Sequence, residues 1–224
     1  MPSLGVPTEE EVLFNLQSLF LVQLATLGDN FVSAKGVSVL MDEVSGELDA
    51  AYFKSADAVG GFCHEHVSSV NTRLHTIEDA LALATALDNG TVHIGKEISV
   101  IAIQCLGKSL HGAFSILMSP TCKSETPEET AKLFHLIKRL WNVEFAHRLG
   151  KIRSFASDGD ARRWQMVHES FMQCELTATH PLYKHLGWLK GFNGQMGEGD
   201  VTGDFDWRHE LKRELHLITF KHAI

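Results

Sequence analysis

The sequence predicts an α/β domain in which a mixed sheet, made of an antiparallel pair and a parallel pair of strands, is flanked by helices. Two strand-like runs, ISVIAIQCL and HGAFSILMS, are joined by a Gly-Lys-Ser turn and indicate a hairpin. A clear amphipathic helix follows, and another strand-like run occupies 152–157. A helix between strands of one sheet is the usual crossover to a parallel neighbour. We therefore expect strand 152–157 to lie parallel to and beside the strand at 36–41.

The N-terminal part begins with a helix and continues into the first strand. Thr8 followed by three glutamates is a capping pattern, and apolar residues then recur at helical spacing until about residue 27. The run from Gly36 to Met41 reads as a strand with Asp42 and Glu43 at its end. Residues 49–66 are compatible with a short hairpin broken at Gly60-Gly61.

Two further helices carry strong start signals. Thr76 begins a helix that Asn89-Gly90 closes, and Thr126, Pro127 and Glu129 form a capping box with proline at the first position. The second helix should cover 127–149, with an apolar stripe made of Leu133, Ile137, Leu140, Trp141 and Phe145. Residues 161–173 should also be helical.

The pattern weakens after residue 176. A glycine- and acid-rich loop precedes DWRHELKRELHLITF (206–220), which reads as a final helix. We divide the chain into an N-terminal helical segment (1–30), a core (31–175) with a helical insertion at about 60–97, and a C-terminal helical extension (176–224).

Composition narrows the class of protein. The 224 residues include 44% hydrophobic ones, which suffices for a substantial core, and the formal net charge of −8 argues against a surface built for non-specific phosphate binding. The four cysteines contain no Cys-x-x-Cys pair, a usage typical of reduced thiols in an intracellular protein. We find neither a signal-peptide pattern nor an apolar run of the ~20 residues that a membrane span needs.

Acidic residues follow two strands that should be neighbours. If strand 152–157 lies beside strand 36–41, then Asp42 and Asp158 end side by side, where their charges repel unless a divalent cation lies between them. Two-metal sites for phosphoryl chemistry are built in this way, with Mg²⁺ or Mn²⁺ as the ion. Glu43 should face away from Asp42, because successive strand residues point to opposite faces. The simpler alternative is that these acids only form turns.

The element order also matches the ribonuclease H-like fold, and several segments extend this resemblance. They are VSVLMDEV, VGGFCHEH, FSILMSPTCKSETPEETAKL, KIRSFASDGDARR and GEGDVTGDFDWRHELKR. In this order they resemble a group of fungal, chiefly basidiomycete, transposon-derived proteins. That group in turn resembles the ribonuclease H-like catalytic region of P-element and THAP-type transposases. The resemblance covers roughly residues 36–216 and implies a nuclear protein that acts on DNA.

The resemblance implies roles for individual residues. Asp42 and Asp158 match the first two catalytic, metal-binding acids of such transposases. Asp206, His209 and Lys212 match a downstream Asp-x-x-His-x-x-Lys segment. Two departures weaken the match: Asp160 replaces a glutamate, and Leu215-His216 replace the Arg-Asn that usually ends the downstream segment.

Two hypotheses about function follow. The family's third acid lies beyond an insertion, and the sequence ends at Ile224, so we expect a truncated core whose nuclease activity is weak or absent. The first hypothesis is a transposase-derived domain for metal-dependent DNA cleavage and strand transfer. The alternative is a non-catalytic relic or domesticated domain that binds a protein partner or forms a homo-oligomer.

Other motifs give weaker signals. Cys63, His64 and His66 suggest zinc, but a structural site needs four ligands and no second pair is evident. The acids at 200–211 fail as a calcium loop, because glycine is missing from the sixth place and Leu211 occupies the last. Arg162 and Arg163 could contact phosphate, although a solvated helix face is the commoner role.

Overall fold

The computed structural model describes residues 5–27, 35–46, 49–107, 112–158, 160–191 and 193–206. The chain divides into two compact units. The first unit takes in residues 1–31, 42–103 and 113–125, and the second unit takes in residues 32–41, 104–112 and 126–224. Two long strands, β1 (Val37–Ser45) and β4 (Glu97–Cys105), continue from one unit into the other.

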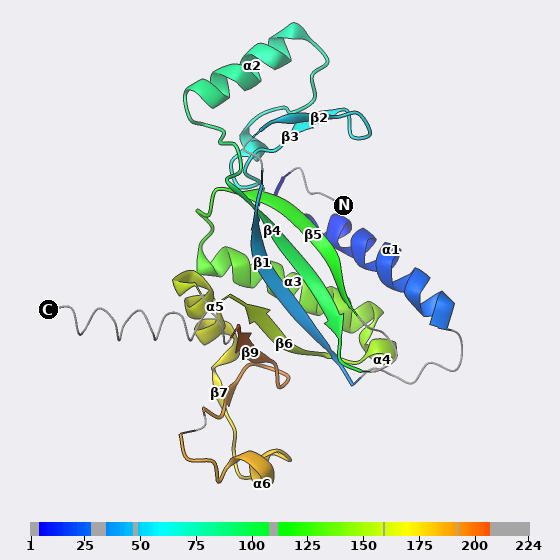
Figure 1. The fold of residues 1–224 in the computed structure, drawn as a ribbon, viewed down its shortest axis with the longest axis vertical. Coiled ribbons are helices and arrows are strands. Elements are labelled where there is room, and N and C mark those ends of the chain that lie inside the picture. Colours follow the sequence, from blue (N-terminus) through cyan, green and yellow to red (C-terminus); the bar gives the residue numbers. More distant parts are fainter. Residues whose placement is uncertain are drawn as a thin grey trace, which may run out of the picture. The chain divides into compact units, whose positions relative to one another are not determined.

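Five strands form one mixed sheet in the order β5-β4-β1-β6-β9 (Figure 1). The other three strands are β5 (Ala113–Thr121), β6 (Ile152–Ser157) and β9 (Thr202–Phe205). β6 pairs in parallel with β1 on one side and with β9 on the other. This arrangement confirms the predicted parallel neighbours and the ribonuclease H-like mixed sheet flanked by helices.

The remaining strand pairs are antiparallel. Leu106, directly after β4, exchanges backbone hydrogen bonds with Lys35 and Gly36, directly before β1. At the other end of β4, Lys96 donates its backbone N–H to the carbonyl oxygen of Thr121, the last residue of β5. The end of one strand therefore lies beside the start of the next in both pairs, as the predicted hairpin requires.

Helices of the second unit cover β6 through an aromatic core. They are α3 (Pro127–Glu144), α4 (Ala146–Leu149) and α5 (Ala161–Phe171). The rings of Phe134 from α3, Phe155 from β6 and Phe171 from α5 are all buried and in mutual contact, with centroids 4.6–5.9 Å apart. Phe134 meets the other two rings edge to face, whereas Phe155 and Phe171 are stacked, and both kinds of aromatic contact add to the stabilisation that burial provides.

The first unit contains a small second core. The elements of this unit include α1 (Glu9–Leu27), the hairpin of β2 (Ala51–Phe53) with β3 (Ala58–Gly60), the 3-10 turn η1 (Val67–Ser69) and α2 (Ile77–Asp88). Five buried side chains hold α2 and η1 together: Phe62, Val67, Leu83, Ala86 and Val92. α1 packs against β5 through Phe20 and Phe114, whose ring centroids are 5.5 Å apart.

Several predicted boundaries need correction. β1 continues to Ser45, beyond Met41, the last residue that β6 pairs, so Asp42 and Glu43 lie within the strand. The predicted helix 127–149 is divided at Phe145 into α3 and α4. Leu133 is only half-buried, and its neighbour Phe134 takes the core position.

The C-terminal range holds more than helix. It contains α6 (Tyr183–Leu186), β8 (Gln195–Met196) and β9, which we did not predict. β8 pairs in antiparallel fashion with β7 (Cys174–Glu175), which lies just before this range. The helix predicted over 206–220 lies outside the described residues, apart from Asp206. Among the helices that the structure describes, none is long and apolar enough to span a membrane.

Candidate metal centres

Three neighbouring parallel strands place an aspartate directly after residues that are in register. Met41 of β1 pairs with Ser157 of β6, and Ser157 pairs with Phe205 of β9. The next residue along each strand is Asp42, Asp158 and Asp206. Ligand sites in parallel sheets gather at this carboxyl edge, so the register supports the predicted location for acidic side chains.

The sequence Ser-Asp-Gly-Asp divides its two acids between different tasks. Asp158 stays near the strand end, where its Oδ1 accepts weak hydrogen bonds from the Ser157 hydroxyl at 3.3 Å and the Asp160 backbone N–H at 3.4 Å. Asp160 is the N-cap of α5, and its Oδ1 accepts from the N–H groups of Arg162 at 2.7 Å and Arg163 at 3.1 Å. The second acid thus begins the helix, which leaves Asp158 as the candidate ligand.

Glu43 differs from our expectation. Asp42 and Glu43 each offer a carboxylate oxygen, and these oxygens lie within 4.8 Å of each other. Asp42 bends along the strand and accepts the Glu43 backbone N–H at 2.9 Å. Strand alternation fixes the direction of the Cβ atoms but not where a long side chain ends. The prediction that Glu43 faces away from Asp42 was therefore wrong.

The downstream motif is only partly described. Asp206 donates its backbone N–H to the carbonyl oxygen of Ser157 at 3.1 Å, which continues the β6–β9 ladder by one residue. Its side chain is exposed and belongs to no group of potential metal ligands among the described residues. His209 and Lys212 lie outside the described residues.

Arg163 has a structural environment that we did not expect. Its side chain is buried, and its guanidinium donates to the Thr130 hydroxyl of α3 at 3.2 Å. Arg162, the residue before it, is exposed. Of the two arginines that could have met phosphate, only Arg162 has the solvent access that such a contact requires.

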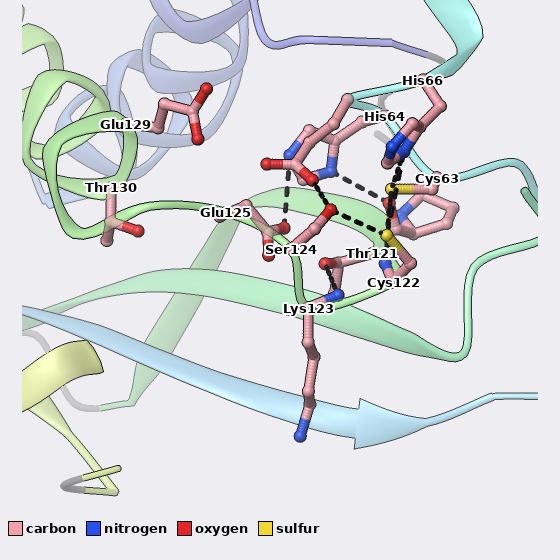
Figure 2. A network of polar contacts seen from close by, with 12 residues as sticks. Cys63, His64, His66, Thr121, Cys122, Lys123, Ser124, Glu125, Glu129 and Thr130 are labelled. Atoms are coloured by element: carbon pink, nitrogen blue, oxygen red, sulfur yellow. Dashed lines mark hydrogen bonds and ion pairs between the residues drawn. The ribbon is translucent and has the colours of Figure 1, made fainter. Parts of the chain in front are cut away.

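A second cluster combines sulfur and nitrogen atoms. The Sγ atoms of Cys63 and Cys122 are 3.3 Å apart, and the Nδ1 atom of His66 lies 3.3 Å from the first and 3.8 Å from the second. Figure 2 shows the two sulfur atoms and the His66 ring gathered at one point. A carboxylate oxygen of Glu65 completes a group whose ligand atoms lie within 4.8 Å of one another.

This cluster changes our interpretation of the Cys-x-x-His segment. The sequence shows no evident second pair of ligands for Cys63 and His66, whereas in the structure Cys122 joins them from the end of β5. His64 is turned elsewhere: its Nδ1 atom lies 2.9 Å from the Pro120 carbonyl oxygen, and its Nε2 atom lies 3.4 Å from the Glu125 carboxylate. The only signal in the sequence was a cysteine directly after a strand, which is not specific.

The thiols of the two buried cysteines, Cys63 and Cys105, are held in their protonated form. Burial, with a smaller contribution from the hydrogen bond to Cys122, raises the pKa of Cys63. Burial alone raises the pKa of Cys105 to about 11. Cys105 belongs to no group of potential metal ligands among the described residues, so it is a core residue of β4.

Comparison with known proteins finds similarity to one solved structure. No family model matches the chain, and no curated protein matches it. A solved structure, the Drosophila P element transposase strand transfer complex, is similar with a TM-score of 0.41 and 12% sequence identity. The similarity covers 84% of this chain and 30% of the transposase chain, so the chain spans less than a third of that protein.

Sheet topology and side chains together define the class of protein. It is a ribonuclease H-like α/β domain with helices flanking a mixed sheet, and it carries groups of side chains that could hold metal ions.

Proposed function

We propose that this chain is a transposase-derived ribonuclease H-like domain of the basidiomycete group described above, which binds Mg²⁺ or Mn²⁺ through Asp42 and Asp158. The observation that carries the proposal is the parallel register of Met41 with Ser157, from which the two aspartates follow. The ordered motifs that resemble transposase segments support it independently. DNA is the substrate that this ancestry implies, and the nucleus is the implied location.

The side chains fit the proposed ion. Mg²⁺ and Mn²⁺ prefer hard oxygen ligands and keep several waters, so a few carboxylates with access to solvent suffice. Asp42 is exposed, and Glu43 and Asp158 are half-buried. Glu43 offers a further carboxylate within 4.8 Å of that of Asp42, and a divalent ion would offset their negative charge.

Each residue has a distinct part in this proposal. Asp42 and Asp158 would bind the ion from neighbouring strands, while Asp160 serves as the N-cap of α5. A bound divalent ion would polarise a phosphodiester and activate water. Efficient cleavage uses two ions, and this small set of acids would hold a second ion poorly. We therefore propose weak or absent nuclease activity for the chain by itself.

A non-catalytic role is the second candidate, as a relic or as a domain that binds a protein partner or another copy of itself. The net charge of −8 favours it, because a protein that holds DNA usually offers a basic face.

A thermal titration with Mn²⁺ tests the metal proposal. Because an ion that binds only the folded state stabilises it, millimolar Mn²⁺ should raise the melting temperature of the wild type. Asp158→Asn should remove this rise, whereas Asp88→Asn, at an exposed aspartate at the end of α2, should keep it. An unchanged melting temperature of folded wild type would reject metal binding at this edge.

An assay for DNA cleavage separates the two candidates. Strong Mn²⁺-dependent nicking of plasmid DNA that is lost in Asp158→Asn would show a complete catalytic site and overturn the non-catalytic candidate. Metal binding without cleavage is the result that we expect.

A further inference from the structure

We propose that Cys63, His66 and Cys122, with Glu65 as the fourth ligand, bind one structural Zn²⁺ ion. The proposal concerns the first unit alone and does not depend on the proposed function of the strand-end aspartates.

The distances fit a tetrahedral ion. With a zinc–sulfur distance of about 2.3 Å and a zinc–nitrogen distance of about 2.0 Å, tetrahedral ligands lie roughly 3.5–3.8 Å from one another. The three observed separations among the two sulfurs and the His66 nitrogen are 3.3, 3.3 and 3.8 Å. A small outward shift of the sulfur atoms would therefore seat the ion.

The chemical nature of the donors selects the metal. Two thiolates and an imidazole favour zinc over the hard ions Mg²⁺ and Mn²⁺. Zinc binding would release the thiol protons of Cys63 and Cys122 to solvent. The backbone N–H of Cys122 already donates to the Cys63 sulfur at 3.3 Å, a contact that would stabilise a thiolate there.

Backbone hydrogen bonds hold the loop that carries Cys63 and His66 in place without a metal ion. The backbone N–H groups of His66 and Val67 both donate to the Cys63 carbonyl oxygen at 3.1 Å, so one tight turn brings Cys63 and His66 together. His64 fastens that turn to β5, because its backbone N–H donates to the Pro120 carbonyl oxygen at 3.0 Å and its ring contacts the same oxygen. Cys122 follows two residues later, which explains how a distant cysteine reaches the turn.

Residues around the ligands support their positions. The His66 ring stacks on the His93 ring with centroids 4.4 Å apart, which fixes the plane of the imidazole. Ser124 lies between the Cys122 sulfur, at 2.9 Å, and the Glu65 carboxylate, to which it donates. Lys123, with a φ of +64°, turns the chain sharply after Cys122. Such surrounding contacts are typical of built metal sites.

Zinc would have a clear structural purpose here. Cys63 directly follows Phe62 and His66 directly precedes Val67, and both apolar residues belong to the small core around α2. A core of five buried side chains provides limited stabilisation, and small cores of this kind often need a metal or a disulfide. The ion would fix the α2 core to the end of β5.

A disulfide between Cys63 and Cys122 is the competing interpretation. The sulfur atoms are 3.3 Å apart, well beyond the ~2.05 Å of a covalent bond. A disulfide would give no role to His66 and Glu65, whose ligand atoms converge on the same point. We therefore favour zinc.

Metal analysis of the purified full chain tests the proposal. Wild type prepared under reducing conditions should hold about one zinc ion per chain, as a structural site does. Cys122→Ser should lose it, whereas Cys174→Ser should retain it, because Cys174 is exposed and belongs to no such group among the described residues. Asp158→Asn should also retain the zinc, which distinguishes this site from the strand-end acids. Glu65→Gln should weaken zinc retention against a competing chelator.

Cobalt substitution keeps the test decisive if Cys122→Ser does not fold. Wild type stripped of metal should bind Co²⁺ with sulfur-to-metal charge-transfer absorption that saturates at about one equivalent. Three results would each overturn the proposal: folded wild type with neither zinc nor this absorption, a folded Cys122→Ser protein that keeps its zinc, or a Cys63–Cys122 disulfide in protein alkylated at cell lysis.

Discussion

Trp141 donates its indole N–H to the carbonyl oxygen of Gly150 at 2.9 Å, and this bond joins α3 to the residue that ends α4. The Trp141 side chain is fully buried, so its polar atom needs this partner. The bond thus joins residues nine positions apart in the segment that leads from α3 to β6. We therefore expect substitutions of Trp141 to lower the stability of the second unit.

Trp141→Phe should lower the free energy of unfolding by about 1–3 kcal/mol, since the change removes the hydrogen bond and part of a buried ring. Trp188→Phe is the matched control, because Trp188 is 73% exposed. Reversible urea unfolding measures both. A Trp141→Phe protein as stable as the control would show that the bond to Gly150 contributes little.

Leu140→Ala should destabilise the protein by about 2–5 kcal/mol, because Leu140 is 6% exposed and its removal leaves a cavity. Leu133→Ala on the same helix should cost clearly less, since Leu133 is only half-buried. Denaturant titration measures the free energy of unfolding of both variants, which carry the same Leu-to-Ala change in the same helix. A loss below ~0.5 kcal/mol for Leu140→Ala would place this side chain outside the core.

Gly203→Ala should destabilise β9 by about 1–3 kcal/mol, because the added methyl group would overlap the Val167 side chain of α5. Val167→Ala removes the overlapping atoms. The double variant should therefore be more stable than the sum of the two single losses predicts, and a double-mutant cycle measures this coupling. Strictly additive losses would show that the two residues do not meet in solution.

Asp79 should make the stability of α2 depend on pH. Hydrogen bonds from the Thr76 backbone N–H and hydroxyl lower the pKa of this capping carboxylate below its ordinary value. A group whose pKa is lower in the folded state stabilises the fold above its unfolded pKa of about 4, and this contribution is lost as pH falls through the folded value.

The stability difference between wild type and Asp79→Ala should accordingly be present at pH 7 and shrink at acid pH. Urea midpoints measured from pH 7 down to the acid limit of reversible folding give this difference. Thr85→Ala on the same helix provides the control, because it removes a hydroxyl bond to the Leu81 carbonyl without an ionisable group. A constant difference across the range for Asp79→Ala would contradict the capping account.

Local chemistry made much of the fold predictable. The helix starts predicted at Thr76 and Thr126 are both formed, and each is a capping box whose hydrogen bonds join residues three positions apart. The parallel pairing of β6 with β1 also followed from the sequence, since a helical crossover permits few other arrangements. The pairing of Met41 with Ser157, the residues directly before Asp42 and Asp158, belongs to that same register.

Tertiary structure alone decided the contacts between distant residues. Sequence periodicity gave no warning that Cys122 would meet Cys63 and His66, because the side chains are brought together by the fastening of His64 to β5. It also missed β9, a short strand of mixed character whose pairing with β6 exists only once the sheet has formed. Capping and periodicity depend on residues within one or two helical turns, whereas this candidate metal centre requires residues that are distant in the sequence to be brought together by the fold.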